Sequence, residues 1–207
     1  MNAEPRTRLI LSLALALLTA AWLPLCAAAP VRGAFEPETD YSVQMLEAVL
    51  RRDGAAGAEA QRLRDEKLAA MGLDYPVLRY AELDLLSRLI AAEAGSTWLD
   101  RDWRMAVGEV ALNRVASPEF PDTLEEVISQ PGQYPVICEK LPAVVPDRES
   151  AEAALALLMG QRVLDCPAVV YQANFVLGGG VYLERRDKLL GTTYFCLSEH
   201  PEQYEIS

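Results

Sequence analysis

The chain of 207 residues contains a single histidine, His200. It lies in the polar stretch 198–202 near the C-terminal end, where a loose, solvated position is expected. Histidine-bearing catalytic triads, cysteine–histidine peptidases and His-ligated zinc hydrolases all need a histidine held inside a site. The sequence therefore argues against these classes and favours carboxylate chemistry among exported enzymes.

Cysteine is also scarce. Cys26 lies in the apolar N-terminal run, and Cys138, Cys166 and Cys196 remain after it, an odd number. In an oxidising exterior one pair could form a disulfide and leave one thiol free, but the spacing does not say which pair. Because the cysteines match no metal motif and no second histidine exists, the sequence predicts neither a metal site nor a cofactor.

The chain has fewer basic than acidic residues. The chain has 19 Lys and Arg against 30 Asp and Glu, which gives a formal net charge of −11. Nucleic-acid phosphates require a basic surface, so no nucleic-acid partner is expected. Internal repeats and low-complexity tracts are lacking as well.

The first 29 residues read as an export signal. Arg6 and Arg8 form a basic start, an uncharged run follows over 9–31, and cleavage is expected after Ala28 or Ala29. Removal of this segment takes the net charge to about −12. An uncleaved membrane anchor is the alternative, because the uncharged run is long. In both cases the rest of the chain works outside the cytoplasmic membrane, either secreted or tethered.

The remaining residues divide into three parts. Residues 30–79 are predicted to be a linker followed by a helical hairpin, and residues 199–207 to be a polar tail. The hairpin helices are expected over 41–52, with Asp40 as a cap, and around 56–71.

Residues 80–198 are predicted to be the catalytic domain. Helical periodicity is followed by alternating strand-like segments after residue 167, which indicates an α+β fold with a small antiparallel sheet in its C-terminal part. The expected helices are 81–94, 101–115, 123–130 and 149–160, and the expected strands are 168–175, 181–184 and 192–198.

Glu93 is the most informative residue. Leu86, Leu89 and Ile90 precede it by seven, four and three residues, so its carboxyl group is expected on the apolar stripe of the helix. Burial of a carboxyl group raises its pKa, and a protonated glutamic acid is what a general acid for glycosidic cleavage requires. A buried Glu paired with an Arg is the alternative interpretation.

A conventional glycosidase needs a second carboxylate, about 5–5.5 Å away if retaining and about 6.5–9.5 Å if inverting. Glu109 is the best candidate, because it lies on the next helix, whereas Asp100 is expected to cap that helix. A lytic transglycosylase needs none. Its single acid protonates the leaving oxygen and then, as a carboxylate, takes the proton of the muramyl C-6 hydroxyl while an anhydro ring closes. One buried Glu without an obvious partner favours this mechanism.

Sugar binding uses planar amides and aromatic faces. Side chains of these kinds cluster on the predicted loops and strands, where binding sites usually gather. The predicted substrate-binding residues are Asn113, Gln133, Tyr134, Tyr171, Gln172, Asn174 and Tyr182. Asn113 could instead only cap the end of its helix.

Three segments carry a family resemblance: RLIAAEAGS (88–96), AVGEVALNRVASPEFPDTLEEVISQPGQY (106–134) and VVYQANF (169–175). The middle one holds LNRV, an SPxFP turn and a PGQ loop in this order. The stretch from about Leu83 to Phe195 resembles the SleB-type (spore-cortex-lytic) cell wall hydrolases. The resemblance implies a lysozyme-like α+β domain that acts on peptidoglycan glycan strands, with Glu93 of the AEA motif as the catalytic acid.

Two positions depart from the family pattern. Many members have Gly-Glu after the AEA motif, where this chain has Gly95-Ser96, and many have a histidine at the position of Thr193. The second change bears on cortex-specific activity during germination more than on the fold, and leaves vegetative wall and spore cortex both open.

The sequence therefore predicts an exported peptidoglycan hydrolase, specifically a lytic transglycosylase that uses Glu93 alone. The alternatives are a hydrolytic muramidase or glucosaminidase with a second carboxylate, and a catalytically silent wall-binding protein. A binding module has no reason to bear the cost of a buried carboxyl group, which favours an enzyme.

Overall fold

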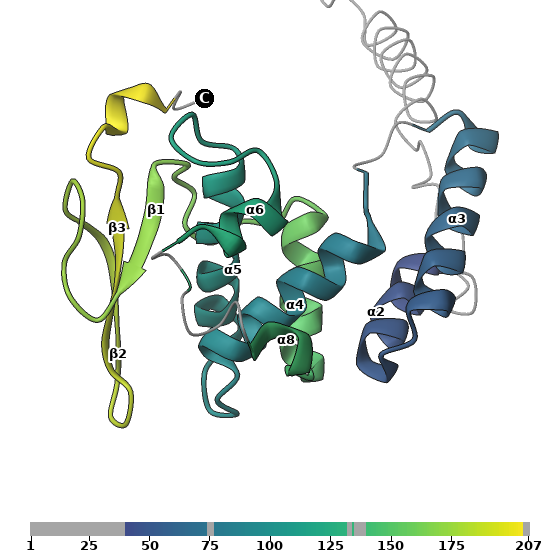
Figure 1. Cartoon of the computed structure of the whole chain (residues 1–207), viewed down its shortest axis with the longest axis horizontal. Coiled ribbons are helices and arrows are strands. Elements are labelled where there is room, and N and C mark those ends of the chain that lie inside the picture. Colours follow the sequence, from purple (N-terminus) through teal and green to yellow (C-terminus); the bar gives the residue numbers. More distant parts are fainter. Residues whose placement is uncertain (1–39, 74–76, 132–133, 135–139, 205–207) are drawn as a thin grey trace, which may run out of the picture. The chain divides into compact units, whose positions relative to one another are not determined.

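The computed structural model describes residues 40–73, 77–131, 134 and 140–204 (Figure 1). The predicted signal over residues 1–29 lies outside these residues. Within them, no helix combines the length and the apolar character needed to cross a membrane.

The described part of the chain begins with a helical hairpin, as predicted. Helix α2 spans Tyr41–Arg51 and helix α3 spans Gly54–Met71. The Asp40 side chain accepts hydrogen bonds from the first backbone N–H groups of α2, and Asp53 does the same for α3 through the N–H of Ala56. Helix α3 starts two residues earlier than predicted because Asp53 acts as a cap as well as a break.

Further along the described part of the chain, three helices begin at a polar capping side chain. Asp100, Thr123 and Asp147 each accept a hydrogen bond from a backbone N–H three residues later, which satisfies donors that an uncapped helix start would leave unpaired. The helices of this part are α4 (Tyr80–Ala94), α5 (Arg101–Val115), α6 (Leu124–Ser129) and α8 (Arg148–Leu158), with the short 3₁₀ helix η2 (Leu141–Ala143) before the last.

The C-terminal part forms a three-stranded antiparallel sheet in the order β1-β3-β2. The strands are β1 (Val169–Ala173), β2 (Val181–Asp187) and β3 (Gly191–Leu197). The register of β1 and that of β2 each shift by one residue opposite the C-terminal end of β3. Helices first and a small antiparallel sheet last confirm the predicted α+β class.

Helix α5 lies between the sheet and the other helices. It contacts β1 on one side and α4 and α8 on the other (Figure 1). This position explains why α5 is buried on most sides, including its charged residues Arg104, Glu109 and Arg114. Gly108 lets the helices approach closely, because a Cβ atom there would lie 2.7 Å from side-chain atoms of both Ile90 and Leu157.

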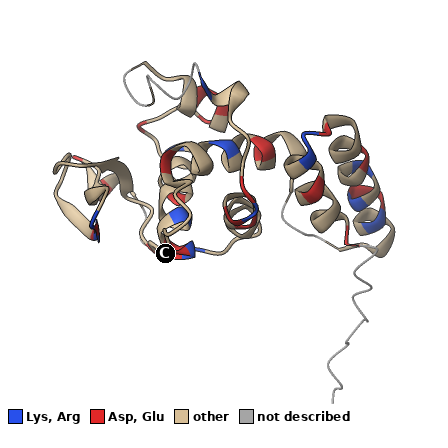
Figure 2. Ribbon diagram, turned by 90° about the horizontal axis from the view of Figure 1, so that it is seen from below, with Lys and Arg blue, Asp and Glu red and all other residues tan. Residues whose placement is uncertain are grey.

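The helical hairpin belongs to the same core as α4 and α8. Met45, Leu46 and Val49 of α2 are buried in one apolar cluster together with Leu86 and Leu89 of α4. The hairpin therefore shares one hydrophobic interior with α4 and α8. Charged residues of both signs are interspersed along the hairpin (Figure 2).

The predicted polar tail packs against the domain as far as Tyr204. A 3₁₀ helix, η3 (Pro201–Gln203), brings the Tyr204 hydroxyl to 2.6 Å from Ser117 Oγ and 2.7 Å from a carboxylate oxygen of Glu119. The same carboxylate accepts a hydrogen bond from Ser198. Only residues 205–207 lie outside the described chain here, and His200 is exposed as expected.

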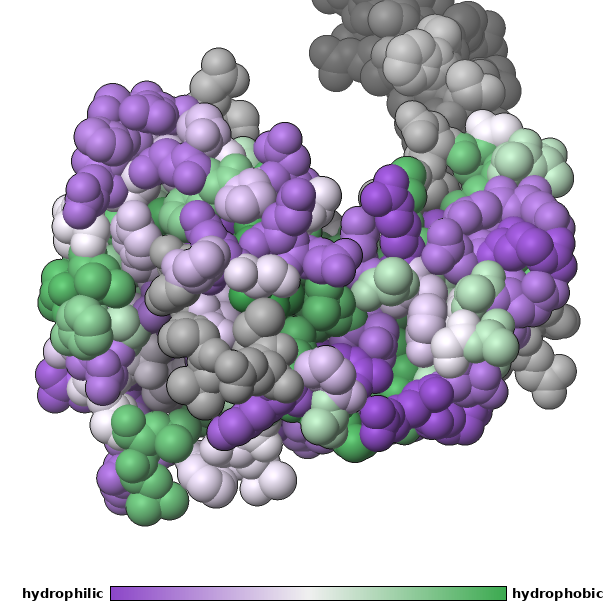
Figure 3. All heavy atoms as spheres, in the orientation of Figure 1, coloured by the Kyte–Doolittle hydropathy of each residue, from purple (hydrophilic) through white to green (hydrophobic). Residues whose placement is uncertain are grey.

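Apolar side chains also reach the surface over the sheet (Figure 3). The large exposed ones in this part are Phe175, Val176, Val181, Tyr182, Leu189 and Leu190.

Candidate active site

Glu93 lies in the last turn of α4, just before Gly95. The residues that predicted its inward face, Leu86, Leu89 and Ile90, are fully buried. Glu93 itself is only half-buried, because the helix ends there and the carboxyl group reaches the edge of the core. One of its oxygens, Oε2, accepts a hydrogen bond of 3.4 Å from Gln172 Nε2 on β1.

Partial burial raises the pKa of Glu93 above its ordinary value, and the positive charge of Arg114 lowers it by a smaller amount. The desolvation effect dominates. The carboxyl group therefore holds its proton to a higher pH than a solvated glutamic acid, which is the property that a general acid needs.

Arg114 is a site residue that the sequence predictions missed. Its side chain is only 4% exposed, and its Nε donates a hydrogen bond of 2.6 Å to the carbonyl oxygen of Val170 on β1. The inward position could have been found, because Arg114 follows Val107, Val110 and Ala111 at helical spacing.

Three aromatic rings surround the Arg114 guanidinium. Its Cζ lies 5.1 Å from the ring centroid of Tyr134, 5.2 Å from that of Phe120 and 6.0 Å from that of Tyr171. These distances are within the range of cation–π attraction. Phe120 and Tyr171 also pack edge to face, with centroids 6.3 Å apart.

The structure brings three of the predicted substrate-binding residues to this place. Gln172 contacts Glu93, while Tyr134 and Tyr171 stack on Arg114. Burial raises the pKa of Tyr134, so its hydroxyl is neutral at neutral pH. Gln133 lies outside the described residues, and Asn174 is exposed just beyond β1.

Two other predicted binding residues are engaged with the backbone. The Asn113 amide donates hydrogen bonds of 3.1 Å and 3.0 Å to the carbonyl oxygens of Cys166 and Val169, which join α5 to the start of β1. The Tyr182 hydroxyl on β2 donates to the carbonyl oxygen of Leu164. Asn113 does not cap its own helix as the alternative supposed, and its donors are occupied.

Glu109, the candidate second carboxylate of the alternative mechanism, is buried with a side chain that is 1% exposed. Its Oε2 accepts hydrogen bonds of 2.7 Å from the Val163 N–H and 3.1 Å from the Leu164 N–H. The carboxylate therefore holds the segment that leads into β1. Asp100, the other candidate, caps α5 as predicted.

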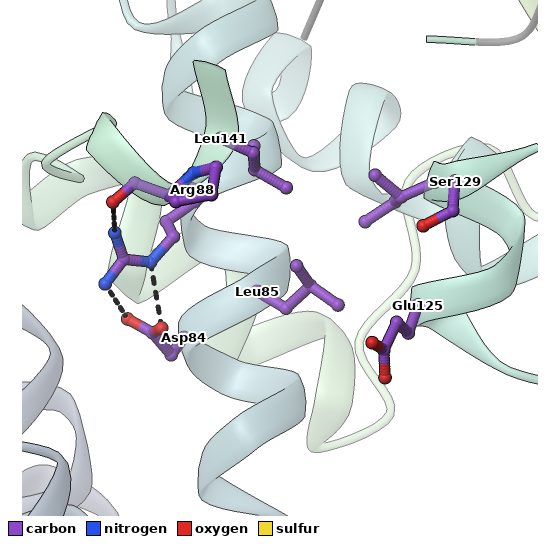
Figure 4. Close-up of a pocket in the computed structure, with 8 residues that line it drawn as sticks. Asp84, Leu85, Arg88, Glu125, Ser129 and Leu141 are labelled. Carbon is purple, nitrogen blue, oxygen red and sulfur yellow. Dashed lines mark hydrogen bonds and ion pairs between the residues drawn. The ribbon is translucent and has the colours of Figure 1, made fainter. Parts of the chain in front are cut away.

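A separate pocket of about 420 Å³ lies between α4, α6 and η2 (Figure 4). Arg88 at its edge is fully engaged, because it binds Asp84 and the carbonyl oxygens of Pro142 and Val144. The pocket is lined by Asp84, Leu85, Arg88, Glu125, Ile128, Ser129, Leu141 and Pro142. Glu93 is not part of this lining.

The described residues offer no group of three His, Cys, Asp or Glu side chains that could hold a metal ion. Cys166 and Cys196 are free thiols. Cys138, the third cysteine that could take part in a disulfide, lies outside the described part of the chain.

Comparison with known proteins shows which proteins this chain resembles. Residues 101–176 match the model of the Cell Wall Hydrolase family. A spore cortex-lytic enzyme of Halalkalibacterium halodurans is 26% identical over 116 residues, which cover 56% of this chain and 34% of that protein. In both comparisons the chain is similar to cell wall hydrolases of the SleB type. It spans about a third of the length of the curated relative it matches.

Among solved structures, the catalytic domain of the Bacillus cereus SleB protein is similar to this chain, with a TM-score of 0.43 and 23% identity. The match covers 56% of this chain and 88% of the other. The segment that matches the family model holds Glu109, Arg114 and Gln172, whereas Glu93 precedes it by eight residues.

Proposed function

We propose that this chain is a peptidoglycan hydrolase that cleaves glycan strands with Glu93 as the general acid. The observation that carries the proposal is the environment of the Glu93 carboxyl group. It is half-buried, its pKa is raised by burial, and it lies beside the Gln172 amide and the Arg114 charge. The match of residues 101–176 to the Cell Wall Hydrolase family model supports peptidoglycan as the substrate.

The mechanism best supported is that of a lytic transglycosylase. Glu93 gives its proton to the glycosidic oxygen, the bond from the muramyl C-1 to that oxygen breaks, and the electron pair leaves with the oxygen. The Glu93 carboxylate then takes the proton of the C-6 hydroxyl as that oxygen bonds to C-1. Glu93 ends protonated, and the product carries a 1,6-anhydro-muramyl end.

Two observations favour this mechanism over a hydrolytic muramidase or glucosaminidase. Glu109 spends its carboxylate on the Val163 and Leu164 N–H groups, and Asp100 spends its own on the start of α5. Neither is free to activate water opposite Glu93. A catalytically silent wall-binding protein would gain nothing from a partly desolvated carboxyl group, because its burial costs stability.

The test is Glu93→Gln, which keeps the shape of the side chain and removes the transferable proton. Cleavage of purified glycan strands should fall by about 10² to 10⁴. Glu82→Gln is the matched control, because Glu82 is on the same helix with its carboxylate paired to the exposed Arg79. A Glu93→Gln variant that cleaves at near wild-type rate would refute the assignment.

Mass spectrometry of the fragments tests the mechanism separately. Anhydro-muramyl ends are expected, and reducing ends would instead establish the hydrolytic alternative. Digestion of vegetative wall and cortex side by side would show which is the substrate. At the position where many relatives have histidine, Thr193 lies in β3 opposite Arg185.

The site of action is proposed to be outside the cytoplasmic membrane. The secreted protein should then begin at Ala29 or Pro30. Recovery of the full-length chain in the membrane fraction would establish the anchored alternative.

A further inference from the structure

Two buried arginines on α5, Arg104 and Arg114, differ in whether a carboxylate pairs with them. Arg104 is 1% exposed, and its guanidinium is paired with the carboxylates of Asp147 and Glu149 and with Ser150. Arg114 is 4% exposed, yet no carboxylate of the described residues forms an ion pair with it. A buried charge without a partner costs several kcal/mol, so this cation needs a specific reason to be there.

The surroundings hold the Arg114 guanidinium without neutralising it. Its Nε is fixed on the Val170 carbonyl, and the rings of Phe120, Tyr134 and Tyr171 enclose it. Its Nη1 is buried and has no hydrogen-bond partner among the described residues. Carbonyl and ring contacts fix the position of the charge but leave it a full positive charge.

Glu93 is the group that can supply a negative charge to balance Arg114. Val170, which holds Arg114, is two residues before Gln172, whose amide contacts the Glu93 carboxyl group. Burial raises the pKa of Glu93, and also those of Tyr134 and Tyr171, and the positive charge of Arg114 lowers each of these pKa values by a smaller amount. Glu93 is neutral before it donates its proton and negative afterwards, so it supplies an anion only in the course of the reaction.

We propose that Arg114 is a positioning residue for Glu93, whose fixed positive charge stabilises the carboxylate that forms when Glu93 gives its proton to the glycosidic oxygen. The inference rests on the proposed function. In this role Arg114 speeds the proton transfer from Glu93 to the glycosidic oxygen. It also holds the Glu93 carboxylate in place to take the proton of the C-6 hydroxyl.

The other titratable groups around Glu93 do not fill this role. Tyr134 and Tyr171 have a pKa raised by burial and remain neutral. On the elements packed against α4 and β1, Glu109 is bound at Val163 and Leu164, and Glu119 accepts hydrogen bonds from Ser198 and Tyr204.

The test compares kcat/KM against pH for wild type, Arg114→Met and Arg114→Lys, on soluble glycan fragments. Because the first step needs protonated Glu93, kcat/KM falls above the pKa of Glu93 in the free enzyme. Arg114→Met should move this fall to higher pH by about one pH unit or more and lower the plateau about tenfold. Arg114→Lys keeps the charge and should restore the wild-type position of the fall. Arg62→Met, in the exposed part of α3, controls for the change of net charge.

A folded Arg114→Met variant whose fall stays at the wild-type pH would overturn the inference. A rise in KM alone would do so too, because it would make Arg114 a substrate ligand. Should Arg114→Met not fold, Arg114→Lys decides: a fall within about 0.3 pH units of wild type supports the inference, and one displaced by a full pH unit refutes it. If Glu93→Gln is inactive and Arg114→Met leaves the fall unmoved, only this inference fails, whereas an active Glu93→Gln variant removes the proposed function itself.

Discussion

Replacement of Glu109 by Gln separates a structural carboxylate from a catalytic one. The native Oε2 accepts two backbone N–H bonds, of 2.7 and 3.1 Å, in a side chain that is 1% exposed. Hydrogen bonds to a charged acceptor contribute about 1.5–3 kcal/mol each, against about 0.5–1.5 for neutral pairs. If the amide oxygen keeps both bonds, the free energy of unfolding should fall by about 2 kcal/mol.

A loss of this size is measurable. For a domain of this length, about 2 kcal/mol corresponds to a decrease in Tm of roughly 4–8 °C. Thermal unfolding followed by circular dichroism would report it, and cleavage assays run well below Tm should give activity within about twofold of wild type. Glu109→Ala leaves both buried N–H groups unpaired, at about 1–3 kcal/mol each, and should be less stable still.

The opposite result would refute this reasoning. If Glu109 were the second carboxylate, Glu109→Gln would be nearly as inactive as Glu93→Gln while its Tm stayed close to wild type. Reducing ends among the wild-type products would complete the refutation.

Three further predictions concern other parts of the molecule. Because the pKa of Glu93 is raised on folding, its protonated form stabilises the fold fully below its ordinary pKa of 4.5. This contribution is lost as pH rises through the folded pKa, so the free energy of unfolding of wild type should decline relative to Glu93→Gln, by about 1.4 kcal/mol for each pH unit that separates the folded pKa from the ordinary one. Gly57→Ala should cost about 1–3 kcal/mol in denaturant unfolding, because the new Cβ would lie 2.1 Å from the Tyr80 ring, whereas Gly54→Ala meets nothing within 4 Å and should be neutral. We expect glycan cleavage to persist in excess chelator, and loss of activity with rescue by one divalent ion would contradict this prediction.

The helices were predictable because their signals are local. Asp40, Asp100 and Thr123 sit at the helix starts that the sequence indicated, and Gly72 ends α3 in the left-handed conformation with φ 63°. The alternation after residue 167 likewise predicted strands, since it reports which side of a strand is buried.

The site was predictable only in part, since its contacts join distant segments. Periodicity identified the face of α4 that carries Glu93, but its contact with Gln172 spans 79 residues and depends on how β1 meets the helices. For the same reason, the sequence could not tell which of the predicted amide side chains would reach Glu93. Gln172 reaches Glu93, whereas Asn113 is consumed in joining α5 to the backbone before β1.

The apolar interior that the hairpin shares with α4 determines where a stably folded fragment of this chain can begin. A fragment that starts at Tyr80 would carry every candidate site residue, yet it would uncover the apolar face that Met45, Leu46 and Val49 now shield. Each such side chain contributes about 1.5–3 kcal/mol when fully buried, and together they rival the entire stability of a typical domain, about 5–15 kcal/mol. The segment that matches the family model, residues 101–176, is therefore shorter than the segment needed for a stable fold. We expect a stable fragment of this chain to need α2 and α3.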